Sequence, residues 1–304
     1  MIAQLKALAE QKGYKLEVVA VDKFELMRQD IKKFSKEAPY NETLRNRIYN
    51  SASIKKIPKW VQSIIILAVP CRAAYINFIF NRNGKQHKFF GLAGVDFDEA
   101  VNYIKDMVTQ AGYEISIAQK LPLKRLAVQS GLAMYGKNNI TSVEGMGSFL
   151  LYEAFYTDIP CEEDNWRDVV VSRLCDGCTI CLENCATGAI AKDRFMIDRD
   201  ICMRKINNKP EDFPDWLPMT AHHTLYGCLK CQGRCPINAG LDTLDVIFTE
   251  DETELIFSGP TWKKASEEFK DKVAMFGTMN KIKKRNLRNL LQLMDEGEGY
   301  EPSL

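Results

Sequence analysis

Ten cysteines occur in this chain of 304 residues, and eight of them lie between Cys175 and Cys235. The first four of the eight, Cys175, Cys178, Cys181 and Cys185, have the spacing C-x2-C-x2-C-x3-C. Closely spaced thiolates on a short loop can hold one cubane of iron and sulfide, while the fourth faces away toward a second cubane. Zinc sites ordinarily use C-x2-C pairs and do not need this run. The spacing therefore predicts [4Fe–4S] clusters rather than zinc or disulfides.

The other four cysteines form a less regular second motif. Cys202 stands alone, an insertion from 203 to 227 follows, and the spacing then resumes as Cys228, Cys231 and Cys235 before a proline. In two-cluster ferredoxins the fourth cysteine of each motif ligates the cluster of the other motif. We therefore predict two ligand sets, one of Cys175, Cys178, Cys181 and Cys235, the other of Cys185, Cys202, Cys228 and Cys231. A buried free thiol is the alternative for Cys202 and the expectation for Cys71 and Cys161.

The elements that must position these loops divide the chain into three segments. Residues 1–165 alternate between helical and strand patterns, which indicates an α/β (α+β) domain. Residues 166–240 have few apolar runs and are expected to form a ferredoxin-like domain built around its metal, and residues 241–304 a short helical tail. Within the first segment we expect helices over 2–11, 23–36, 96–111 and 121–130, and strands over 16–21, 64–69 and 148–156.

Composition and charge exclude several classes of function. The net charge of +1 gives no strong attraction to nucleic acid or to anionic membranes. The most apolar run, residues 64–69, is too short to cross a bilayer, and the first residues lack the apolar core of a signal peptide. We therefore expect a cytoplasmic protein that does not associate with a membrane.

A longer motif precedes the cysteines. The segment from Leu126 to Asn139 (LAVQSGLAMYGKNN), Gly147-Ser-Phe and the cysteine pattern together resemble the epoxyqueuosine reductase family and its relatives, the reductive dehalogenases. This resemblance covers roughly residues 60–240. It implies a cobalamin that lies between an α/β domain and two [4Fe–4S] clusters. The clusters would reduce the cobalt of this cobalamin from Co(II) to Co(I). The residues that match the corrinoid-lining part of the family are Tyr135, Gly136, Lys137, Asn138, Gly147 and Ser148. An ordinary helix–turn–strand connection with a glycine cap is the alternative.

Two departures from the family pattern bear on the substrate. The family carries an acidic proton donor before this motif, but here the matching position is near Ile117, and no carboxylate occurs between Glu114 and Glu144. The tail after Gly240 is also short for the helical-repeat domain with which family members often hold tRNA. We therefore expect a small-molecule substrate rather than tRNA, and the catalytic residues stay unknown.

The remaining candidates for proton transfer are weak. Tyr135 and Tyr156 could supply a proton, although core packing is the simpler role for each. His222 and His223 lie in the insertion beside Cys228, where they could order a cluster or face the cofactor, but we expect a solvated pair.

Three functions are consistent with these observations. The leading one is an iron–sulfur, corrinoid-dependent reductase that receives electrons from an external donor such as ferredoxin or flavodoxin. An electron-transfer or corrinoid-reactivating protein, which has no substrate and serves a partner protein, is the second. A ferredoxin fused to a flavin-binding domain is the third, and the absence of a G-x-G-x-x-G fingerprint weakens it.

Overall fold

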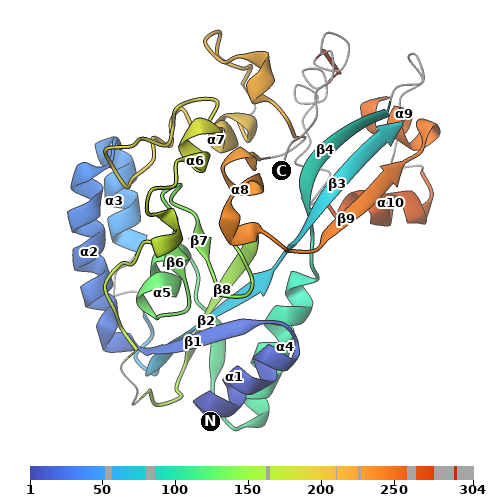
Figure 1. Cartoon of the computed structure of the whole chain (residues 1–304). Helices are drawn as coiled ribbons and strands as arrows, with labels where there is room; N and C mark the ends of the chain where they lie inside the picture. The colour runs from blue at the N-terminus through green and yellow to red at the C-terminus, as the bar shows by residue number, and fades with distance from the viewer. Residues whose placement is uncertain are drawn as a thin grey trace. The chain divides into compact units, whose positions relative to one another are not determined.

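The computed structural model forms two compact units that are interleaved along the chain (Figure 1). The first unit contains residues 1–70, 96–178 and 192–198, and the second contains residues 71–95, 179–191 and 199–304. The structure describes residues 1–51, 57–79, 86–161, 165–209, 211–224, 227–258, 265–276 and 291–292. The three-segment division of the sequence stays a prediction. None of the described helices has the length and apolar character needed to span a membrane.

A four-stranded sheet is the centre of the first unit. Its strands are β1 (Lys15–Ala20), β2 (Ser63–Pro70), β8 (Leu150–Thr157) and β5 (Ile115–Ile117), in that order, and every neighbouring pair is antiparallel. The strands expected over 16–21, 64–69 and 148–156 are confirmed within one or two residues at most ends. Seven of the eight β2 residues are buried, so this strand needs cover on both faces of the sheet.

Five helices of the first unit supply that cover. Helices α1 (Ile2–Gln11) and α4 (Phe97–Gln110) contact each other, and they pack on β1 and β5 respectively. Helix α5 (Leu123–Gln129) packs on β2 and β8 and contacts α2 (Phe24–Glu37), which in turn packs against α3 (Glu42–Ser51). All four expected helices of this region are therefore present.

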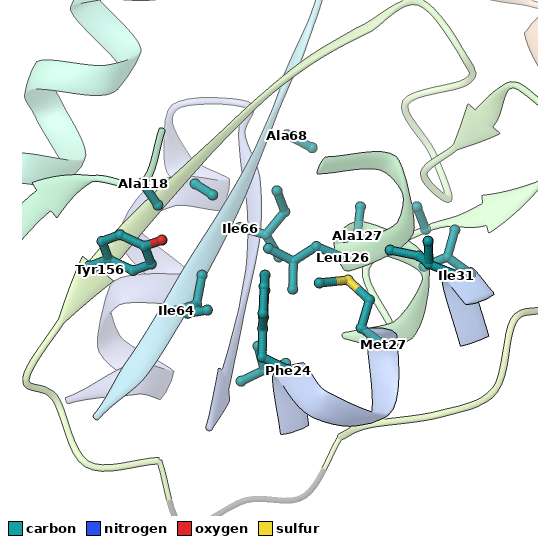
Figure 2. Packing of buried hydrophobic residues seen from close by; sticks show 14 of the residues in the cluster. Phe24, Met27, Ile31, Ile64, Ile66, Ala68, Ala118, Leu126, Ala127 and Tyr156 are labelled. Atoms are coloured by element: carbon teal, nitrogen blue, oxygen red, sulfur yellow. The ribbon is translucent and has the colours of Figure 1, made fainter. Parts of the chain in front are cut away.

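Alternate side chains of β2 enter the core beneath α2 and α5. Ile64, Ile66 and Ala68 pack there, because successive strand residues point to opposite faces of a sheet. Figure 2 shows Ile66, Leu126 and Phe24 in this cluster, and none of the three is more than 1% exposed. Burying each such side chain contributes about 1.5–3 kcal/mol to folding, so this core fixes the helix that leads to the family motif.

Two short strands follow α5 and carry that motif. Strand β6 (Met134–Tyr135) pairs with β7 (Thr141–Ser142) as a small antiparallel hairpin.

The second unit has its own sheet, which the sequence patterns did not predict. Strand β3 (Arg72–Ile79) pairs with β4 (Gln86–Ala93) as a hairpin and with β9 (Thr243–Phe248) in parallel. Helices α9 (Glu250–Ser258) and α10 (Glu267–Ala274) complete it, and Phe78, Phe248 and Phe269 form its core.

The expected helical tail is therefore different from the structure at its start. Residues 243–248 form a strand because they pair with β3, far away in the sequence, and helices follow only afterwards. The basic run from Lys281 to Arg288 lies outside the described residues.

The cysteine motifs of the second unit lie on very short elements. Helices α6 (Ile180–Glu183) and α8 (Lys230–Gly233) contact each other, and α7 (Met203–Asn207) begins the insertion. Single turns of 3-10 helix occur at Val21–Lys23, Arg173–Cys175, Met219–Ala221 and Pro236–Asn238. The insertion has a small apolar core of its own, made of Met203, Ile206, Leu217 and Ala221.

Candidate functional site

The two cysteine motifs have the same backbone conformation. The residue before α6, Thr179, has φ −122° and ψ 0°, and the residue before α8, Leu229, has φ −121° and ψ 2°. The backbone N–H of Cys185 donates to Leu182 at 3.2 Å, and the N–H of Cys235 donates to Gln232 at 3.0 Å. In both motifs the last cysteine therefore donates to the residue three positions before it, and the two bonds lie 50 residues apart. The two motifs are thus structural copies, despite the insertion that separates Cys202 from Cys228.

All ten cysteines lie in the described part of the chain, and none of them forms a disulfide. No group of three His, Cys, Asp or Glu side chains among the described residues converges as a single metal ion would require. A cubane is larger than one ion and holds its thiolates further apart.

Four thiols of the second unit lie within electrostatic range of one another. The pKa of Cys228 is raised to about 12, chiefly by burial and also by the nearby Cys202 and Cys185. Burial also raises the pKa of Cys231 well above its usual value, again with contributions from Cys228, Cys202 and Cys185. Such thiols stay protonated unless a bound metal stabilises their thiolates.

The other predicted ligand set is divided between the two units. Cys175 and Cys178 belong to the first unit, and Cys181 and Cys235 belong to the second. Cys175 is buried and closes a single 3-10 turn, and the N–H of Cys178 donates to the carbonyl of Cys175 at 3.2 Å. This ligand set stays a prediction.

The β6–β7 hairpin contains four of the six predicted cofactor-binding residues. The N–H of Gly136 donates to the carbonyl of Ile140 at 2.7 Å, and the side-chain oxygen of Asn138 accepts from the N–H of Ile140 at 3.1 Å. A Cβ at position 136 would lie 2.7 Å from that same side-chain oxygen. Glycine is therefore required at 136 as long as Asn138 closes the turn.

Lys137 joins this hairpin to the first cysteine loop. Its Nζ donates to the backbone carbonyl of Cys178 at 3.1 Å, across 41 residues of sequence. A second link is the N–H of Ser172, which donates to the carbonyl of Tyr135 at 2.7 Å. The hairpin and the start of the cysteine motif are therefore held together within the first unit.

The last two predicted cofactor-binding residues follow a tight turn after β7. Gly147 has a φ of +71°, which favours glycine, and its N–H donates to the carbonyl of Val143 at 3.1 Å. Ser148 is buried directly after this turn.

The two tyrosines differ in their surroundings. Burial raises the pKa of Tyr135 to about 12, partly offset by the nearby positive charge of Arg125, and its ring meets that of Phe195 edge-on at 5.1 Å. Burial also raises the pKa of Tyr156, which packs in the core beneath α2 and α5. Tyr156 therefore has the core role that we expected.

The prediction of a solvated histidine pair is wrong. His222 and His223 are 0% and 4% exposed, because the insertion folds around its own apolar core. Nε2 of His223 accepts from the N–H of Leu229 at 3.2 Å, and its Nδ1 lies 3.0 Å from the carbonyl of Ala221. Both contacts suit the neutral ring, and burial lowers the pKa of His223 to about 4.

Helix α5 carries a buried charge that the sequence pattern did not predict. Arg125 is only 7% exposed, although its helix has the amphipathic pattern that usually places arginine in solvent. Its burial depends on α2, which no local signal connects to α5.

Comparisons with known proteins give these observations a family context. Residues 174–238 match the family model described as a 4Fe-4S double cluster binding domain. The chain is 29% identical over 119 residues to epoxyqueuosine reductase of Bacillus subtilis, a match that covers 39% of this chain and 30% of that protein. The enzyme of Cyclobacterium marinum is 32% identical over 116 residues, which is 38% of this chain and 36% of that protein. More than a third of the chain is thus similar in sequence to epoxyqueuosine reductases.

Solved structures of these reductases have the same fold. The structure from Bacillus subtilis has a TM-score of 0.66 at 20% identity and covers 96% of this chain and 80% of that one. The structure from Streptococcus thermophilus has a TM-score of 0.62 at 18% identity, with 98% and 86% covered. The predicted family resemblance and the double-cluster domain are confirmed. In sequence, the matches span only about a third of the curated reductases' own length.

Proposed function

We propose that this chain is an iron–sulfur, corrinoid-dependent reductase related to epoxyqueuosine reductase, and that its substrate is a small molecule. The observation that carries the proposal is the bond from Lys137 to the carbonyl of Cys178. It ties the loop that resembles a corrinoid-binding segment to the loop that begins the cluster motif. Electrons that arrive at the clusters then have a short covalent and hydrogen-bonded route toward that loop.

The proposed ligands of the clusters are the eight cysteines of the two motifs. One cluster takes Cys175, Cys178, Cys181 and Cys235, and the other takes Cys185, Cys202, Cys228 and Cys231. The repeated backbone and the mutual influence of the buried thiols in the second unit fit this assignment. Clusters of this type supply single-electron transfer.

The proposed corrinoid site consists of Tyr135, Gly136, Lys137, Asn138, Gly147 and Ser148. A corrinoid held there would supply the low-potential redox chemistry that the reduction needs. Gly147 has a positive φ and no side chain, which suits a turn that lies against a large planar ligand. The residues therefore fit the group.

The chain's own residues have three roles in this scheme. Asn138 and Gly136 hold the hairpin in one conformation, and Lys137 fixes its distance from the cysteine loop. Tyr135 keeps its proton at neutral pH because burial raises its pKa to about 12, so its hydroxyl is available to donate to the substrate. An external donor such as ferredoxin or flavodoxin supplies two electrons per turnover, in single steps.

The nature of the substrate follows from the family departure at Ile117. One related reductase was crystallised with an epoxyqueuosine-modified tRNA stem loop, and another is described by a catalytic aspartate loop. Here β5 ends in Ile117, an apolar side chain that is 42% exposed. A substrate that needs no carboxylate as proton donor, and no tRNA-sized surface, fits this site better.

The same departure supports a second candidate function. A protein without the proton-donating carboxylate could pass electrons to a partner, as an electron-transfer or corrinoid-reactivating protein does. The two functions differ in whether reduced protein consumes a substrate in the absence of any partner.

Anaerobic reconstitution with iron and sulfide, followed by addition of cobalamin, tests the proposal. Wild-type protein is expected to hold about eight iron atoms and about one corrinoid per chain. Lys137→Met should keep the iron but bind the corrinoid at least tenfold more weakly, whereas Lys192→Met, which removes an exposed lysine, should match wild type. Protein that holds its iron and binds no corrinoid contradicts the proposal.

A further inference from the structure

A buried arginine without a counter-ion lies beside the proposed corrinoid site. The side chain of Arg125 is 7% exposed, and its Nη1 atom has no hydrogen-bond partner among the residues that the structure describes. Among the described residues no carboxylate forms an ion pair with it. An isolated buried charge is costly, so such a group normally shifts its pKa or is paired. Arginine cannot lose its proton near neutral pH, so the charge remains.

Two aromatic rings lie against this guanidinium, and a third ring packs on both of them. Its central carbon lies 4.5 Å from the ring centre of Phe34 on α2 and 5.6 Å from that of Tyr135 on β6. The ring of Phe195 meets Tyr135 edge-on at 5.1 Å and Phe34 at 6.0 Å. Aromatic rings attract the guanidinium through its flat face. Its N–H groups point outward in its own plane, where the rings accept no hydrogen bonds and where an oxyanion would bind.

One carboxylate on α2, that of Asp30, is engaged by Gln129. Oδ2 of Asp30 accepts from Nε2 of Gln129 at 2.5 Å. Arg125 and Gln129 are four residues apart on α5, and Asp30 and Phe34 are four residues apart on α2, so each pair lies on one helix face. Arg125 contacts Phe34, and Gln129 contacts Asp30. The side-chain oxygen of Gln129 is buried and also has no hydrogen-bond partner within the described ranges. This face of α5 therefore presents an unused donor and an unused acceptor one turn apart.

We infer that Arg125 is the receptor for an oxyanion, a carboxylate or a phosphate, and that Gln129 accepts a hydrogen bond from a hydroxyl or N–H group of the same ligand. The inference rests on the proposed function only in placing this ligand at the reductase site. There, the substrate would carry a carboxylate or a phosphate group. The corrinoid's own phosphodiester is the other source of such a group.

Phosphate-dependent thermal unfolding of the full chain tests the oxyanion site without any corrinoid. Inorganic phosphate at constant ionic strength should raise the Tm of wild type by about 3 °C once it is well above its Kd. Arg125→Met should abolish this rise and, because it removes an uncompensated charge, should not lower the Tm measured without phosphate. Arg28→Met is the matched control, since Arg28 also lies over a tyrosine but pairs with Glu25.

If Arg125→Met does not fold, Arg125→Lys is used in its place. This variant should bind phosphate at least tenfold more weakly than wild type, because lysine lacks the forked donors of the guanidinium. The inference is overturned if phosphate stabilises neither protein, or stabilises wild type and the Arg125 variant equally. Comparison of cobalamin with cobinamide, which lacks the nucleotide phosphate, distinguishes the sources. If the Arg125 variant binds cobalamin more weakly than wild type does but binds cobinamide equally well, the oxyanion is the phosphodiester of the corrinoid. If the variant binds both corrinoids as wild type does, the oxyanion belongs to the substrate. Failure to bind either corrinoid would affect the proposed function and leave the phosphate result standing.

Discussion

The ammonium group of Lys137 donates to the backbone carbonyl of Cys178 at 3.1 Å and so ties the β6–β7 hairpin to the first cysteine loop. A hydrogen bond from a charged donor contributes about 1.5–3 kcal/mol when desolvated, and less for a part-buried pair such as this. The bond connects the family motif with the cluster motif inside a single compact unit.

Removing this bond should loosen the cysteine loop. Lys137→Met is expected to lower the free energy of unfolding by about 1 kcal/mol and to speed the loss of iron to a chelator, because the Cys178 carbonyl loses its charged partner. Urea denaturation and chelator kinetics measure the two effects. Lys137→Arg, which can still donate, should recover most of the lost free energy of unfolding and most of the retention of iron. Equal behaviour of the two variants would show that this hydrogen bond does not stabilise the loop.

Gly136 and Asn138 should behave as a coupled pair. A Cβ at 136 would lie 2.7 Å from the Asn138 side-chain oxygen, so Gly136→Ala is expected to cost about 1–3 kcal/mol through steric conflict. In an Asn138→Ala background that conflict is gone, and the cost of Gly136→Ala should fall by at least half. Additive losses of stability in the double variant would show that the turn is not closed by Asn138.

Cys202 is the ligand that needs the most direct test. Cys202→Ser should reduce the iron content after anaerobic reconstitution from about eight atoms per chain to about four, because one cluster loses a thiolate. Cys71→Ser, which changes a half-buried cysteine outside both motifs, is the control and should keep about eight. Full iron content in Cys202→Ser would make Cys202 a buried thiol.

Stability should fall in acid because of His223. Burial lowers the pKa of this ring to about 4 from its usual value of 6.5, so the unfolded chain binds a proton that the folded chain excludes. The contribution of the neutral ring is complete above pH 6.5 and is lost as the pH falls toward 4. At pH 5 the loss is at most about 2 kcal/mol.

His223→Gln keeps a side chain that can accept from Leu229 but does not titrate. The difference in unfolding free energy between wild type and this variant should therefore change between pH 7 and pH 5, with wild type losing more. A difference that is constant across this range would mean that burial does not lower the pKa of His223.

The parts of the fold that the sequence predicted are those with strong local patterns. Strand β2 is a continuous apolar run, and α4 has an apolar face and an Asp96 side chain that accepts from the N–H of Glu99 at 2.8 Å. The cysteine spacing likewise predicted the double-cluster domain without any structural input.

What the sequence could not predict depends on contacts between distant segments. Strand β9 exists because it pairs with β3, and its own residues alternate too briefly to distinguish it from a tail. The burial of Arg125 and His223 has the same origin, since each polar side chain is enclosed by residues from other elements. Local patterns place both of them in solvent.

Electron transfer from the clusters to a bound corrinoid is the central claim, and an anaerobic optical titration tests it most directly. Reconstituted wild-type protein loaded with cobalamin and reduced stepwise by a ferredoxin or flavodoxin should show the clusters bleach and the spectrum of the bound corrinoid then change. Cys228→Ser should bind the corrinoid but leave its spectrum unchanged, because the electron route is broken. A corrinoid spectrum that responds equally in wild type and Cys228→Ser, or in neither, would contradict the account.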